Sequence, residues 1–259
     1  MGEKRMPVLF VGHGTPMNAI EDNQYSQTWD RLGRELPKPE AVVCISAHWE
    51  TVGTEVTGME KPKTIHDFDG FPRALFEKEY PAPGDPSLAI NICSTARPVT
   101  IRPNLTWGLD HGAWSVLCRM YPQADVPVLQ ISLDRTRDGL FHYNLGRSLR
   151  FLRETGVLVI GSGNIVHNLM LMSWGGYPYE WAEEIDRQVR DYIVQGNHDP
   201  LIRYEKLGPG VKYAINSGEH YLPLLYVLAM QREDEPVEFF NESIVAGSVS
   251  MRGVIIGRE

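Results

Sequence analysis

Four of the eight histidines fall just beyond apolar segments that are typical of buried strands. They are His13, His48, His167 and His220. The carboxyl ends of parallel strands are where α/β proteins build their sites. Imidazole nitrogens that converge there suit Fe(II) or Zn(II), whereas Mg and Ca prefer oxygen ligands. The positions of these histidines therefore predict a metal centre at strand ends.

Two of these histidines lie in or after glycine-rich turns. Glycines on both sides of His13 let the backbone pass close to a ligand, and Pro16 stiffens the turn. A histidine that bonds only to backbone in a strand-ending turn is the ordinary alternative. Residues 161–163 (Gly-Ser-Gly) precede His167 and resemble the start of a dinucleotide-binding fingerprint. Val166 stands where its third glycine is needed, so we do not expect an NAD site.

Glu219 and His220 are adjacent at the expected start of an apolar helix, which Ser217 is placed to cap. Neighbouring helical residues are roughly 100° apart around the axis, so only one of the pair is expected to point fully into a shared site. The other reading of Glu219 is a first-turn acid that complements the helix dipole. These residues alone leave the choice open.

The remaining histidines are less informative. His111 follows Asp110 at a predicted helix start, where side chains and free N–H groups can face a ligand, although an aspartate cap is the ordinary explanation. His66 lies in the proline-rich segment 59–86, which we interpret as a functional loop that could face substrate. His142 is expected within an amphipathic helix, and His198 in a solvated turn.

The elements that must position these residues indicate one α/β domain over residues 1–259. Several strands are continuous Val/Ile/Leu runs, which predicts burial on both faces of a sheet covered by helices. Strands are expected over 7–11, 41–47, 53–58, 98–102, 126–132, 156–161, 211–216 and 243–256, the last interrupted at Gly247 or Gly253. Helices are expected over 23–36, 86–96, 112–121, 137–154, 164–172, 179–195 and 217–230.

Composition narrows the class of partner. Lys plus Arg is 25 and Asp plus Glu is 33, giving a net charge of −8 without a basic cluster. We therefore expect neither nucleic acid nor an anionic membrane as partner. No apolar stretch is long enough to span a bilayer, and the N-terminus lacks a signal-peptide core. Cys44, Cys93 and Cys118 form no CxxC pair, which favours free thiols and a cytoplasmic location.

Six segments together resemble the class III, LigB-type extradiol ring-cleavage dioxygenases, and within them the group that opens the ring of L-DOPA. In chain order they are GHGTP at 12–16, SAHWE at 46–50, HDFDGFP at 66–72, LDHGAW at 109–114, GSGNIVHNL at 161–169 and EHYLPLL at 219–225. Each segment is weak alone, but six in family order are specific. The resemblance implies a central mixed sheet flanked by helices, with the metal site at strand ends.

The resemblance also implies roles for residues. It implies His13 and His48 as metal ligands, with the third from the Glu219–His220 pair, where the match favours His220. His167 matches the acid/base histidine of the class and could count as a fourth ligand when zinc is bound. His111 matches a pocket histidine near the substrate. Further residues that could meet the substrate are His66, Trp49, Tyr221 and Arg73.

The implied reaction is the opening of a catechol ring with O2. We expect Fe(II) for activity, because zinc is d¹⁰ and has no redox chemistry, and Zn(II) as the metal bound in purified protein. Two alternatives remain. One is a zinc-dependent hydrolase or amidase with Glu50, Glu219 or His167 as general base. The other is a non-catalytic binding protein like the Memo proteins, which would have lost ligands that are present here.

Overall fold

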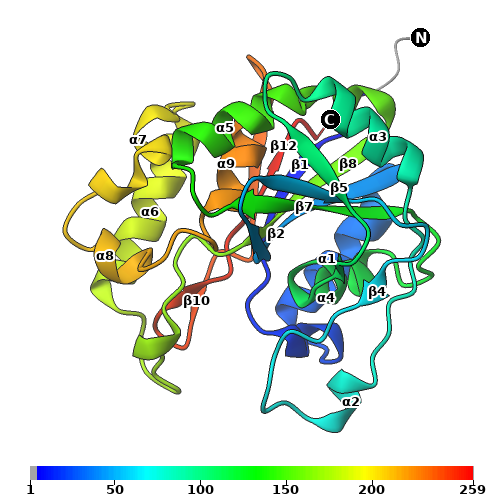
Figure 1. The fold of residues 1–259 in the computed structure, drawn as a ribbon. Helices are drawn as coiled ribbons and strands as arrows, with labels where there is room; N and C mark the ends of the chain where they lie inside the picture. Colours follow the sequence, from blue (N-terminus) through cyan, green and yellow to red (C-terminus); the bar gives the residue numbers. More distant parts are fainter. Residues whose placement is uncertain (1–4, 259) are drawn as a thin grey trace.

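The computed structural model describes residues 5–258, and its centre is an eight-stranded mixed sheet (Figure 1). From one edge to the other the strands are β5 (Ile101–Asn104), β3 (Thr54–Thr57), β7 (Val128–Asp134), β2 (Ala41–Thr51), β8 (Val157–Gly163), β1 (Val8–Gly12), β12 (Gly253–Ile256) and β9 (Val237–Phe240). The four central strands β7, β2, β8 and β1 are mutually parallel. Their carboxyl ends therefore share one edge, as the histidine positions require.

Helices cover both faces of this sheet. The helices are α1 (Gln24–Glu35), α2 (Arg73–Phe76), α3 (Pro86–Thr95), α4 (His111–Met120), α5 (Gly139–Ser148), α6 (Glu180–Val194), α7 (Asp199–Ile202), α8 (Val211–Ala214) and α9 (Leu222–Ala229). Short 3₁₀ helices are η1 (Pro16–Ala19), η2 (Arg150–Thr155), η3 (Leu169–Leu171) and η4 (Tyr204–Lys206). Among residues 5–258, no helix is long and apolar enough to cross a membrane.

Alternation along the buried strands divides the core into two layers. In β1, Val8 and Phe10 pack with residues of α3, α5, α6 and α9, whereas Leu9 and Val11 pack with residues of α1 and α4. Successive side chains of a strand point to opposite faces, so an unbroken apolar run fills both layers. The predicted fold class, a mixed sheet flanked by helices, is confirmed.

The prediction was wrong between residues 211 and 221. Residues 211–216 were expected as a strand, but Val211–Ala214 form α8. Val211, Ala214 and Ile215 are the buried positions, and this spacing is helical rather than alternating. The next helix, expected from residue 217, begins at Leu222 with Pro223 in its first turn, and Ser217 does not cap it. His220 therefore lies in a turn before α9 and does not follow a strand.

Other segments also differ from expectation. Residues 164–172, expected as a helix, form an extended segment with bridges from His167 and then η3. The predicted helix 137–154 divides into α5 and η2, and the strand expected over 243–256 divides into β10 (Ile244–Val245), β11 (Val249–Ser250) and β12. Gly247, with φ of 73°, lies in the turn between β10 and β11. The edge strand β9 was not predicted.

The segment 59–86 is irregular, as expected. Its regular elements are α2 and the short strand β4 (Lys63–Thr64), which pairs with β6 (Gly108–Leu109). That pairing fastens the segment beside the start of α4, and Asp110 accepts a hydrogen bond from Ala113 N as the N-cap of that helix. The loop is thereby held next to the carboxyl edge of the sheet.

Candidate metal centre

His13 and His48 are carried by strands that both pair with β8. β1 ends at Gly12, and the His13 amide donates to the Gly163 carbonyl at 3.1 Å, so the first histidine continues the ladder. His48 lies inside β2, where the register against β7 shifts between Ile45 and Glu50. Such a bulge re-aims a side chain near a strand end. The sheet therefore fixes the backbone of both histidines.

His167 and His220 are carried by irregular segments packed on the end of β8. The Asn164 amide donates to the His220 carbonyl at 2.9 Å, and the His167 amide donates to the Ala214 carbonyl at 2.9 Å. A Cβ atom on Gly163 would lie 2.0 Å from the His220 carbonyl oxygen. Only glycine permits this close approach, which brings the turn before α9 against the sheet.

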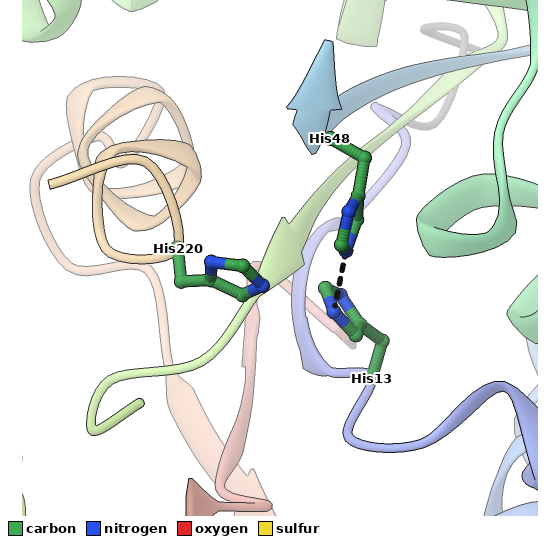
Figure 2. Close-up of side chains that lie close together, drawn as sticks. All are labelled: His13, His48 and His220. Atoms are coloured by element: carbon green, nitrogen blue, oxygen red, sulfur yellow. Dashed lines mark hydrogen bonds between the residues drawn. The ribbon is translucent and has the colours of Figure 1, made fainter. Parts of the chain in front are cut away.

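The rings of His13, His48 and His220 point toward one another from three separate segments (Figure 2). The Nε2 atoms of His13 and His48 lie 3.2 Å apart. One ligand nitrogen from each of the three rings lies within 4.8 Å of the others. His13 and His220 are buried, and the side chain of His48 is 20% exposed.

The outward nitrogen of each ring has an oxygen partner. His13 Nδ1 lies 3.0 Å from Ser162 Oγ, which donates its own proton to the Gly112 carbonyl at 2.5 Å. The serine can therefore only accept from His13, which places the imidazole proton on Nδ1. His220 Nδ1 donates to Glu219 Oε1 at 3.1 Å. Both rings thus present an unprotonated Nε2 to the centre of the cluster.

Two further histidines flank this cluster. The His167 ring stacks on His220 with centroids 3.5 Å apart, and the His111 ring lies 3.9 Å from that of His48. Asp67 Oδ2 lies 3.0 Å from His111 Nδ1 and 3.4 Å from His48 Nδ1. Five of the eight histidines therefore gather at one place.

Burial and mutual proximity favour the neutral form of four of these imidazoles, those of His13, His48, His167 and His220. Desolvation, followed by the neighbouring His48 and His220, lowers the pKa of His13 well below its ordinary value. Desolvation also lowers the pKa of His48 and of His220, the latter against the opposing effect of Glu219. The pKa of His167 is lowered to about 3 by burial and then by His220. Neutral imidazole is the form that binds a metal.

These residues fit a divalent metal. Tetrahedral ligands at 2.0–2.1 Å from Zn lie about 3.3 Å apart. The His13–His48 separation of 3.2 Å matches that value. Within residues 5–258, the buried His220 Nε2 has no hydrogen-bond partner. An oxygen partner behind each ring is the usual support of metal-binding histidines.

The family follows from a comparison with known proteins. Residues 7–254 match the model of the catalytic LigB subunit of aromatic ring-opening dioxygenase. The chain belongs to the LigB family. The match includes every segment that carries the histidine cluster.

Relatives agree with the LigB assignment over almost the whole chain. A 4,5-DOPA dioxygenase extradiol from Escherichia coli (strain K12) is 46% identical and covers 99% of this chain and 97% of its own. A protein of that name from Beta vulgaris is 37% identical, covering 93% of each chain. The crystal structure of an uncharacterized protein from Escherichia coli K12 superposes with a TM-score of 0.83, at 41% identity, over 98% of this chain and all of that one. Together they support an extradiol ring-cleaving dioxygenase, which is an oxidoreductase.

Three residues predicted to meet substrate lie outside the LigB histidine cluster. Trp49 is buried and stacks on Trp107, because it points away from the face of β2 that carries His48. Tyr221 is buried and donates to the Leu201 carbonyl at 3.1 Å. Arg73 is exposed and pairs with Glu77. The contacts described for these three side chains are with residues outside the cluster.

His66 lies near the cluster but faces its own loop. Its Nε2 lies 2.9 Å from the Lys78 carbonyl, and its ring packs edge-on against Phe68 at 5.8 Å. His198, expected in a solvated turn, is instead half-buried, with Nδ1 2.9 Å from Tyr143 Oη. His142 is fully buried in α5.

Sequence reasoning missed the residues that hold the LigB histidines in place. Ser162 was treated only as part of a turn, and Asp67 and Phe68 only as loop residues. Phe68 lies 5.6 Å from His111 in an edge-to-face arrangement, so it contributes a wall next to the cluster. The signal was present, because Asp67 and Phe68 belong to the HDFDGFP segment that matches the family.

Proposed function

We propose that this protein opens the ring of a catechol, L-DOPA or a similar 3,4-dihydroxyphenyl compound, with O2 at a non-haem metal held by His13, His48 and His220. The observation that carries the proposal is the convergence of three imidazoles, two of them buried, with a separation that suits one ion. The names of the relatives from Escherichia coli and Beta vulgaris support the choice of substrate. We further propose a cytoplasmic protein with one catalytic domain over residues 1–259.

Fe(II) is the metal we propose for turnover, with Zn(II) as an occupant that supports binding but not oxidation. When bound, the ion would lower the pKa of the catechol hydroxyls, and iron, unlike d¹⁰ zinc, could also exchange electrons with O2. His220 is our choice over Glu219 as third ligand, since Glu219 accepts hydrogen bonds from His220 Nδ1 and Ser217 Oγ. Glu219 then orients the ligand and contributes negative charge behind it.

His167 and His111 are the residues that we propose to handle protons. Each ring lies against a proposed ligand, His167 on His220 and His111 on His48, so each is close to where the catechol oxygens would bind. Because burial lowers the pKa of His167 to about 3, its ring is neutral and can accept a hydroxyl proton. This pKa is lower than the near-neutral value that best suits an acid/base residue.

The pocket wall is proposed to come from the 59–86 loop. Phe68 presents its ring to His111, and His66 packs behind Phe68. An aromatic wall of this kind would stack or pack against the substrate ring while excluding water. His66 would then act on substrate through Phe68 rather than by direct contact.

The experiment is anaerobic loading of the apoprotein with Fe(II), followed by O2 and a panel of catechols. We expect a yellow ring-opened product and one O2 consumed per catechol. Zinc-loaded protein should bind the same catechols without O2 uptake. Turnover of an ester or amide by the zinc form, without O2 uptake by the iron form, would favour the hydrolase alternative.

A further inference from the structure

The side chain of Asp67 lies between two of the clustered histidines and comes from a different part of the chain. It belongs to the irregular 59–86 loop, and its side chain is 20% exposed. Oδ2 lies 3.0 Å from His111 Nδ1 and 3.4 Å from His48 Nδ1, and Oδ1 accepts a hydrogen bond from the His111 amide at 2.9 Å. One carboxylate thus faces a proposed metal ligand, a proposed proton-handling residue and a helix start.

Each oxygen of Asp67 has a separate task. Oδ1 satisfies a free amide in the first turn of α4, where negative charge is also favoured by the helix dipole. Oδ2 is an acceptor only and lies close to the Nδ1 atoms of both His48 and His111, so it favours the tautomers that carry the proton on Nδ1. In that tautomer His48 has an unprotonated Nε2, which is the atom that lies 3.2 Å from His13 Nε2.

We propose that Asp67 is a positioning residue that sets His48 and His111 together and couples the 59–86 loop to the metal centre. The proposal rests on the proposed function for the identity of the reaction that is affected. The next residue, Phe68, packs against His111. The loop therefore supplies both the aromatic wall of the proposed substrate pocket and the carboxylate that holds His48 and His111. A carboxylate behind a metal-binding histidine orients the ring and raises its basicity.

The test is Asp67→Asn, with Asp69→Asn as matched control. The asparagine retains Oδ1 for the His111 amide but places an NH2 group against two imidazole N–H groups, so the helix start is kept and the ring acceptor is lost. Asp69 is exposed on the same loop and its substitution makes the same change in charge. Affinity of the apoproteins for zinc is measured by competition with a chromophoric chelator, and kcat and KM with Fe(II), O2 and L-DOPA.

For Asp67→Asn we expect zinc affinity to fall at least about tenfold and kcat to fall by more than KM rises, with an unchanged far-UV spectrum. Asp67→Glu, which keeps a carboxylate, should recover most of the zinc affinity, and Asp69→Asn should behave as wild type. If Asp67→Asn kept the zinc affinity and kcat of the wild type, the proposal would be overturned. Asp67 would then have no role beyond accepting the hydrogen bond from the His111 amide at the start of α4. The same holds if Asp67→Asn loses its fold while Asp67→Glu fails to recover zinc affinity. If the wild-type protein opens no catechol, the proposed function fails, but the zinc measurement still tests Asp67.

Discussion

The two halves of the histidine cluster are built differently. His13 and His48 extend from parallel strands whose backbone is fixed on both sides by the sheet. His167 and His220 lie on irregular segments that are held by a few backbone hydrogen bonds and by close packing on Gly163. We call His13 and His48 the strand half of the cluster, and His167 and His220 the loop half. The sheet as a whole positions the strand half, whereas local contacts position the loop half.

This difference shows what fixes the position of each proposed metal ligand. A ligand on a sheet needs only the correct rotamer, and the Ser162 hydroxyl supplies it for His13. A ligand on a turn also needs its backbone placed, and a glycine without a side chain does that for His220. Substitutions should therefore affect metal binding through side chains in the strand half and through backbone packing in the loop half.

The largest expected effect is the loss of one ligand from either half. His13→Ala and His220→Ala should each lose bound metal and more than about 100-fold of activity, beyond the cost of removing an outer partner. Metal content and O2 uptake with L-DOPA are the measurements. His198→Gln, a histidine outside the cluster, is the control. A variant that keeps one full equivalent of zinc would show that its half is not part of the metal site.

The next effect separates His167 from its stacked neighbour His220. If His167 handles protons, His167→Ala should bind zinc nearly as wild type while kcat falls by about 10²–10⁴. Chelator competition and steady-state rates give the two quantities. Lost zinc affinity would instead make His167 a fourth ligand, and the loop half would then supply as many ligands as the strand half.

The strand half could be predicted from sequence because local pattern and position agree there. An unbroken apolar run such as residues 7–11 predicts a buried strand, and a polar residue directly after it must lie at the sheet edge. His13 is of this kind, whereas His48, expected directly after its strand, lies inside β2 at the irregularity near its end. Asp110, which caps α4 as its position before the helix predicts, is another.

The loop half could not be predicted from pattern in the same way. Residues 211–216 contain Val211, Tyr213 and Ile215, which favour a strand, yet Val211, Ala214 and Ile215 are buried at helical spacing and Val211–Ala214 form α8. The sequence pattern put His220 after a strand, whereas the structure brings it to the cluster from a turn before α9. Partners distant in sequence, such as Ser162 for His13 and Asp67 for His48, cannot be paired from local pattern, although Asp67 lies in a segment that matches the family.

A buried histidine outside both halves shows which features distinguish a metal-site histidine from an ordinary core histidine. His142 is buried, its Nδ1 lies 3.0 Å from Tyr226 Oη, and burial lowers its pKa to about 4. The unfolded chain takes up this proton near pH 6.5, so between pH 6.5 and 4 the unfolded state binds more protons. The associated stability is complete above pH 6.5 and is lost as pH falls toward 4, by about 3 kcal/mol in total.

His142→Gln should therefore flatten the pH dependence of the free energy of unfolding between pH 4 and 6.5 without affecting zinc affinity. Urea unfolding at several pH values gives the difference between the two proteins. Parallel curves would show that His142 is not held neutral in the fold. A lowered histidine pKa is thus found both in the cluster and in the hydrophobic core. Ring nitrogens that converge on one point are what distinguish the cluster.

The smallest expected effect tests the backbone packing of the loop half. In Gly163→Ala the new Cβ would meet the His220 carbonyl at 2.0 Å, and a carbonyl in a hydrogen-bonded turn yields less readily than a side chain. We expect a loss of about 1–3 kcal/mol in the free energy of unfolding, as for other overpacked positions. Because the shift moves His220 away from His13 and His48, zinc affinity should also fall.

Gly58→Ala is the matched control for this substitution. Its Cβ would lie 3.4 Å from the side chains of Leu105 and Pro103, an ordinary contact, so stability and zinc affinity should stay near wild type. If Gly163→Ala lowers stability but leaves zinc affinity unchanged, the turn before α9 can follow the displaced backbone without moving the His220 ring. The two halves would then differ in the elements that carry them but not in how tightly each ligand is placed.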